Sequence, residues 1–209
     1  MHVRQRALPP ITPCLPPPTM IRALYRVLAG TAGAALLFAA LTGAEIRRLD
    51  LRSMVAETDG AVYGKILGRE VIRFDHPEDG PDLFFTHLTV EGRSLVDGSA
   101  QTITVTYPGG FIDEVNGVHN SEAPSEDDVK DGNQVVVFYK WSSNMGGDLA
   151  GNALFASHGG LFRTAKGGNG RVVLGRGDGY AVADNLLLEQ LDRNITTLHE
   201  ETRRDQRQK

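Results

Sequence analysis

The stretch Gln101–Phe111, QTITVTYPGGF, decides the fold that we expect for this chain. Apolar and polar residues alternate through its first part, which is typical of a strand with one buried face. We expect Ile103, Val105 and Tyr107 to face a core and the intervening threonines to face solvent. Pro108 has no N–H to donate, so strand pairing is expected to end there. The stretch therefore predicts an antiparallel strand with a glycine-rich end.

Segments on both sides of this stretch predict partner strands. Ala61–Phe74 and Leu83–Val96 form a predicted hairpin, with a bulge expected at Gly68. Val135–Tyr139 is a continuous apolar run and is expected to be the most buried strand. Shorter strands are expected at Ala153–Ser157, Leu161–Thr164 and Arg171–Gly175.

A helix is expected near each end of the exported chain. Glu45–Thr58 and Asn185–His199 have apolar residues at helical spacing, with Asp50 and Asp184 as expected N-caps. The charged tail Glu200–Lys209 is expected to be flexible. Because no alternation of strands and helices appears, we expect one mainly β (α+β) domain over residues 45–199. Its architecture is a small antiparallel β-barrel or curled sheet with an N-terminal and a C-terminal helix.

The N-terminal residues predict export. Residues 1–19 are rich in proline and are interpreted as a misassigned, disordered extension that precedes the true start at Met20. Residues 20–44 combine Arg22 and Arg26, an apolar run and small residues, which is the layout of a secretory signal peptide. The alternative is an uncleaved membrane anchor, since the uncharged run reaches the lower limit of spanning length.

Charge and cysteine content narrow the function classes. Cleavage after Ala44 removes four arginines and no acid, which takes the formal charge from −4 to −8. This acidic balance argues against nucleic-acid binding. The only cysteine is Cys14, so the mature chain is cysteine-free and has neither a disulfide nor a thiolate nucleophile. Export without disulfides favours a secreted or periplasmic bacterial protein of the cell envelope.

Several short motifs carry a resemblance to a known group of proteins. They are the expected helix end Thr58–Ala61, the strand segments Val62–Ile66 and Phe85–Leu95, the strand end Pro108–Gly110, and Asp131–Tyr139, in which Asp131 and Gly132 precede a strand. This pattern resembles a group of uncharacterised secreted bacterial proteins, similar to the OB-like barrels of netrin-type modules and tissue inhibitors of metalloproteases. The resemblance implies an OB-like barrel and suggests protease inhibition. Those inhibitors act through an N-terminal cysteine, which the mature chain lacks, so no inhibitory residue can be assigned.

The sequence predicts no catalytic, cofactor-binding or metal-binding residues. Asp75–Asp79 could bind a cation at a turn, but it has no recognisable zinc spacing and is interpreted as a solvated turn. The acidic segment Asp113–Asp131 lacks the register of a calcium loop and is expected to be a long surface loop. Ser157 and His158 are neighbours on an expected strand, where they would point to opposite faces. No cofactor is therefore expected.

The leading hypothesis is an exported non-enzymatic β-barrel module that binds a protein or another envelope partner. The expected contact surface combines two loop segments, with the candidate residues Pro108, Gly109, Gly110, Asp113, Glu114 and Trp141. Two alternatives remain. One is a secreted protein resembling protease inhibitors, and the other is a metal-binding protein or hydrolase that uses the scattered histidines and aspartates.

Overall fold

The computed structural model describes residues 49–207. The expected extension, signal segment and anchor alternative lie outside these residues. The described elements are α2 (Leu51–Glu57), β1 (Gly60–His76), β2 (Gly80–Ser94), β3 (Ala100–Pro108), β4 (Gly110–Phe111), β5 (Gly117–Val118), β6 (Gln134–Ser142), β7 (Gly151–Leu154), the 3₁₀ helix η1 (Ser157–Gly160), β8 (Leu161–Gly167), β9 (Gly170–Val173), β10 (Leu186–Leu187) and α3 (Leu188–Arg207).

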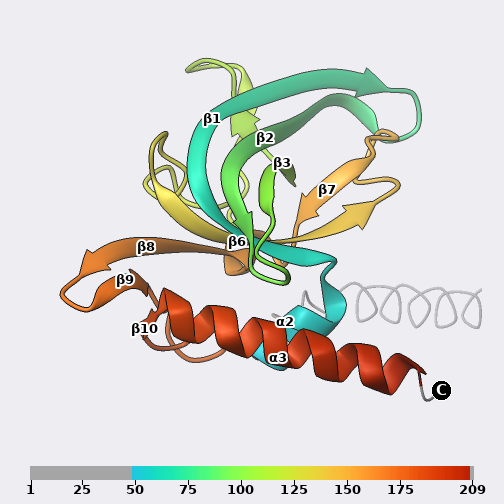
Figure 1. Ribbon diagram of the computed structural model, residues 1–209. Coiled ribbons are helices and arrows are strands. Elements are labelled where there is room, and N and C mark those ends of the chain that lie inside the picture. Colours follow the sequence, from blue (N-terminus) through green and yellow to red (C-terminus); the bar gives the residue numbers. More distant parts are fainter. Residues whose placement is uncertain (1–48, 208–209) are drawn as a thin grey trace, which may run out of the picture. The chain divides into compact units, whose positions relative to one another are not determined.

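Five strands close into a barrel, in the order β1–β2–β3–β7–β6 and back to β1 (Figure 1). All of these pairs are antiparallel except β3–β7, in which Val105 lies opposite Asn152. The strands β8, β9 and β10 extend the sheet outward from β6. The predicted class is confirmed: a mainly β (α+β) small barrel with a helix near each end of the described residues.

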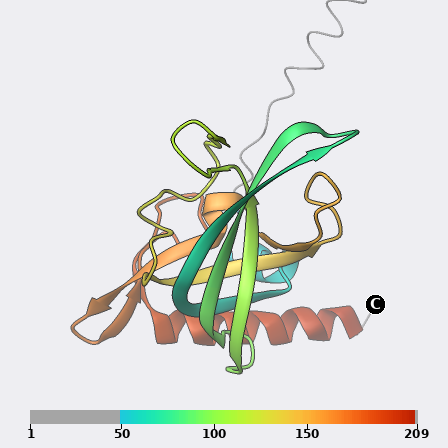
Figure 2. The same cartoon turned by 90° about the horizontal axis from the view of Figure 1, so that it is seen from above.

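The first part of the long strand β1 pairs along both of its edges, with β2 on one side and β6 on the other. Its first part pairs with β6, from Gly60 opposite Tyr139 to Lys65 opposite Gln134. Its whole length pairs with β2, with a register shift between Ile66 and Gly68. The predicted bulge at Gly68 is therefore confirmed. Figure 2 shows the resulting curl of β1 over β2 and β3.

Two separate cores explain the continuous apolar run of β6. Val135 and Val137 point into the barrel interior, where they join Val62, Leu88 and other barrel residues. The alternate residues Val136 and Phe138 belong to a second core, which is covered by α2 and α3 (Figure 1). Because both faces of β6 are buried, every position from Val135 to Phe138 is inaccessible to solvent, as predicted.

The predicted N-cap is correct for α2 but not for α3. Asp50 caps α2 as expected, since its Oδ1 accepts a hydrogen bond of 2.7 Å from the Ser53 N–H. The predicted cap Asp184 is wrong, because α3 starts at Leu188. The Arg176 N–H donates to the Val182 carbonyl and the Gly177 N–H to the Ala183 carbonyl, and Leu186–Leu187 form β10, so the residues around Asp184 are not helical. At its other end α3 continues to Arg207, so most of the expected flexible tail is helical.

Two further expectations, about Thr106 and about Ser157 with His158, need correction, whereas the expected end of β3 does not. The threonine face of β3 is not wholly solvated, because Thr106 is 4% exposed and its hydroxyl lies 2.7 Å from His87 Nδ1. The expected end of strand pairing at Pro108 is confirmed, because β3 ends there with Pro108 opposite Phe85, and one further backbone bond runs from the Gly109 N–H to the Phe84 carbonyl. Ser157 and His158 lie in η1 rather than in a strand.

Candidate functional site

A two-stranded ribbon follows β3 and projects from the barrel. Gly110 of β4 pairs with Val118 of β5, and Phe111 pairs with Gly117 (Figure 1). Gly110 has a φ of +129°, and a Cβ there would lie 2.4 Å from Thr86 Oγ1. The Thr86 hydroxyl donates to the Gly109 carbonyl at 2.6 Å. The consecutive glycines are therefore required where the ribbon leaves β3 and crosses the mouth of the barrel.

The tip of the ribbon is held in one conformation by Asp113. Its Oδ1 accepts hydrogen bonds from the N–H groups of Val115, at 2.9 Å, and Asn116, at 2.8 Å. Its Oδ2 accepts from the Asn116 side-chain amide at 2.6 Å. These bonds, led by the Asn116 amide, lower the pKa of Asp113 below its ordinary value. The carboxylate therefore has a structural role in the turn rather than an open ligand position.

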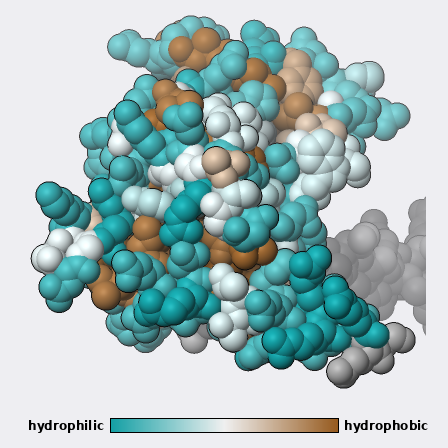
Figure 3. Space-filling model, in the orientation of Figure 1, coloured by the Kyte–Doolittle hydropathy of each residue, from teal (hydrophilic) through white to brown (hydrophobic). Residues whose placement is uncertain are grey.

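The ribbon exposes a group of apolar side chains, which we call the ribbon patch: Phe111, Ile112, Val115 and Val118. Val115, at the tip, is 87% exposed. Figure 3 shows brown, hydrophobic side chains on the projecting upper part of the molecule, where the ribbon lies in Figure 1. Four of the seven exposed large hydrophobic side chains of residues 49–207 belong to this patch. Such a concentration on one projecting element is typical of interaction surfaces.

A groove of about 390 Å³ lies beneath the ribbon, at the mouth of the barrel. Its walls are formed mainly by Val71, Thr86, Tyr107, Phe111, Val118 and Ala123. Burial raises the pKa of Tyr107 above its ordinary value, so its phenol is neutral. Arg69 and Glu126 form an ion pair of 2.5 Å, and both line the groove. The groove therefore combines an apolar floor with a polar edge.

The acidic segment that forms the far wall of the groove is anchored to the fold. Asp128 is 9% exposed and forms ion pairs with Arg163, at 3.0 Å, and Arg176, at 2.9 Å. Val129 beside it is buried in the barrel core. The expectation of a wholly solvated loop is therefore wrong for this part. The anchor fixes the position of the groove wall and of the acids around it.

The structure brings five of the six predicted contact residues together. Pro108, Gly109 and Gly110 lead into the ribbon, while Asp113 and Glu114 form its turn. Trp141 is 58% exposed but lies on β6 opposite Asn152, with its N–H donating to Asp59 Oδ2 at 2.6 Å.

The loop after Trp141 packs on the β1–β2 hairpin instead of on the ribbon. Gly147 donates its N–H to Asp79 Oδ2 at 2.6 Å, and His76 Nε2 lies 3.2 Å from Asp148 Oδ2. The loop that follows Trp141 and the segment Pro108–Glu114 were expected to form one contact surface. In the structure they contact different elements.

The histidines and acids considered from the sequence make local contacts. His76 Nδ1 accepts hydrogen bonds from the N–H groups of Glu78 and Asp79 in its own turn. His158 Nε2 lies 2.9 Å from the Tyr180 hydroxyl, and His158 Nδ1 lies 3.0 Å from the Glu122 carbonyl. Both ring nitrogens therefore contact groups other than a serine hydroxyl. Within residues 49–207, no group of three or more histidine, cysteine, aspartate or glutamate side chains could hold a metal ion.

The apolar members of the ribbon patch were missed by sequence reasoning. The acids of Asp113–Asp131 suggested a solvated loop, although the stretch FIDEVNGV places four apolar residues among them. Asp113 followed by Asn116 and Gly117 was a usable turn signal, because it predicts a hairpin that would project these residues.

No known protein family, curated protein or solved structure matches this chain. The fold and the site define its class: a small closed β-barrel that carries a projecting apolar ribbon. In the part of the chain that the structure describes, no helix is both long enough and apolar enough to cross a bilayer.

Proposed function

We propose that this chain is an exported, non-enzymatic binding module that docks a protein partner of the cell envelope through the ribbon patch. The observation that carries the proposal is the exposure of Phe111, Ile112, Val115 and Val118 on one projecting hairpin. The turn formed by Asp113 supports it further, because an ordered hairpin loses little conformational entropy when it binds. Export is supported by the sequence of residues 20–44.

The charges around the ribbon define the chemistry of the partner. Asp113 and Glu114 lie in the turn, and Glu122 and Glu126 lie in the segment that follows it. A complementary partner presents a shallow apolar pocket for the tip residue Val115, surrounded by lysine or arginine side chains. Burial of one valine contributes about 1.5–3 kcal/mol, which corresponds to about 10- to 150-fold in affinity.

The test is capture of partners from an envelope extract by the immobilised full chain, followed by crosslinking and mass spectrometry. Val115→Asp is expected to reduce recovery of the partner by at least about tenfold, because a carboxylate would enter an apolar pocket. Leu67→Asp is the matched control, since Leu67 is also exposed but lies at the β1 bulge. This control is expected to capture as the wild type does.

The outcomes separate the alternatives. Equal capture by Val115→Asp and wild type would refute the role of the ribbon, and recovery of no partner would refute the proposal. If the captured partner is a secreted metalloprotease, protease inhibition becomes the specific form of this binding function. In that case Val115→Asp is expected to weaken inhibition by the same factor as capture.

A further inference from the structure

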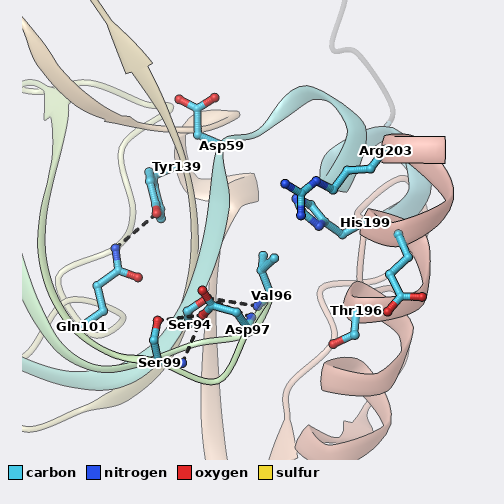
Figure 4. Close-up of a pocket in the computed structure, with 11 residues that line it drawn as sticks. Asp59, Ser94, Val96, Asp97, Ser99, Gln101, Tyr139, Thr196, His199 and Arg203 are labelled. Carbon is cyan, nitrogen blue, oxygen red and sulfur yellow. Dashed lines mark hydrogen bonds between the residues drawn. The ribbon is translucent and has the colours of Figure 1, made fainter. Parts of the chain in front are cut away.

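A polar cleft of about 580 Å³ lies between α3 and the end of the barrel formed by the β2–β3 turn. Gln101, at the first part of β3, lines this cleft, whereas the ribbon follows the last residue of β3. The cleft is therefore separate from the ribbon patch. Asp59, Asp97, Gln101, Tyr139, His199 and Arg203 are among the residues that line it (Figure 4). Glu200 also lines the α3 wall, where its carboxylate forms an ion pair of 3.2 Å with Arg204.

The α3 wall of the cleft carries two side chains that are free to bind an anionic group. His199 and Arg203 are four residues apart and so share one face of the helix. Figure 4 shows both side chains lying close together and directed away from α3 toward the barrel. Among residues 49–207, neither has a hydrogen-bond or ion-pair partner. The guanidinium of Arg203 thus has its planar donor set available for a carboxylate.

The barrel wall opposite carries carboxylates held in fixed positions. Asp97 Oδ1 accepts hydrogen bonds from the Ser99 N–H, at 3.1 Å, and from the Ser99 hydroxyl, at 2.7 Å. The Ser99 hydroxyl is the largest of the effects that lower the pKa of Asp97 to about 2. Asp59 Oδ2 is engaged by the Trp141 N–H, which leaves Oδ1 for another donor. Both acids line the cleft and favour a cationic group.

Neutral hydrogen-bonding groups lie on the barrel side of the cleft, on the side of Asp59 and Asp97 that faces away from α3 (Figure 4). The Gln101 side-chain amide donates to the Tyr139 hydroxyl at 3.2 Å, which leaves the Gln101 carbonyl and the Tyr139 O–H for a ligand. A purely anionic ligand would meet Asp59 and Asp97, and a purely cationic ligand would meet Arg203. A molecule with both charges satisfies both walls, and the volume is within the range of small-molecule sites.

We propose that this cleft binds a small zwitterion with a free ammonium and a free carboxylate, namely an amino acid or a short peptide. The carboxylate lies against Arg203 and His199, and the ammonium lies against Asp97, on the opposite wall. Gln101 and Tyr139 provide hydrogen bonds to the part of the ligand that extends past the acids, away from α3. This activity goes beyond the proposed docking of a protein partner and does not depend on it.

The test is calorimetric titration of the full chain with alanine, dialanine and trialanine, and with trialanine blocked as the N-acetyl or the C-amide form. We expect saturable binding of at least one unblocked compound, and about tenfold or greater weakening when either end is blocked. The single amino acid and the peptides distinguish the two possible ligand sizes. Absence of binding by all three unblocked compounds at millimolar concentration would overturn the proposal.

Variants locate the binding in this cleft. Arg203→Gln is expected to weaken binding by about tenfold or more, since it removes the charged donor to the carboxylate. Arg193→Gln is the matched control, because Arg193 is exposed on the same helix but does not line the cleft. Equal binding by the two variants would overturn the assignment. Circular dichroism of both variants verifies that α3 is intact.

Discussion

Gly92 packs against the backbone of β1 with no room for a side chain, and its substitution by alanine tests how the barrel closes. Gly92 of β2 lies opposite Gly64 of β1, which in turn lies opposite Val135 of β6. A Cβ on Gly92 would lie 2.0 Å from the Tyr63 carbonyl oxygen and 2.4 Å from the Gly64 Cα. These are backbone atoms, so no side-chain rotation can relieve the contact.

Gly92→Ala is expected to destabilise the fold because two paired strands must separate to make room for the new methyl group. Alanine at position 92 must push β2 away from β1 at a point where β1 is also held by β6. Overpacking in a core costs about 1–3 kcal/mol, and a contact with fixed backbone belongs at the upper end of this range. For a domain of this size, about 3 kcal/mol corresponds to a fall in the melting temperature of about 6–12 °C.

The assay is urea and thermal unfolding of Gly92→Ala, followed by far-ultraviolet circular dichroism. Gly68→Ala is the matched control, because it introduces the same methyl group into the same pair of strands. A Cβ at Gly68 has no atom within 4 Å, and we expect a change within about 1 kcal/mol. An unfolding midpoint for Gly92→Ala equal to that of wild type would refute the reasoning. Equal losses in both variants would refute it as well.

Two further predictions concern the carboxylates that fix the acidic segment and the β2–β3 turn. Asp128→Asn is expected to lower the free energy of unfolding by about 2 kcal/mol in urea titrations, because it leaves Arg176 without its buried partner. The Arg163 side chain is partly exposed, so its ion pair with Asp128 contributes less to the free energy of unfolding than a fully buried ion pair would. Asp97 has a folded pKa of about 2 against an ordinary value of 3.8. Its contribution to stability is therefore present above about pH 4 and lost as the pH falls toward 2. The stability difference between wild type and Asp97→Asn is expected to shrink over that interval, and a pH-independent difference would contradict this assignment.

The sequence predicted the elements in which local pattern and tertiary environment agree. The alternation of Ile103, Val105 and Tyr107 matches their burial in the barrel core. Asp50 caps α2 because the cap requires only its own helix. Gly68 marks the bulge of β1, where the strand changes register against β2.

Other features depend on contacts between segments that are distant in sequence. Thr106 was expected to be solvated because neither its contact with His87 nor the parallel partner Ala153 is visible from the local pattern. Asp184 has the chemistry of a helix cap, yet pairing of the neighbouring residues with the segment after β9 delays the helix to Leu188. The polar cleft joins α3 to the β2–β3 turn, which lie far apart in the chain.

The segment after β3 shows most clearly why the candidate site required the structure. A solvated acidic loop needs neither fixed ends nor apolar side chains, but this segment has both. Asp113 orders its first turn, and Asp128 fixes its far end through two arginines. Between these anchors the chain leaves Val115 almost fully exposed on a hairpin. Ordering a segment opposes folding through conformational entropy, and exposing large apolar side chains gives no burial in return. The docking that we propose for the ribbon patch would account for both features at once, because it would bury the apolar residues and use a conformation that is already ordered.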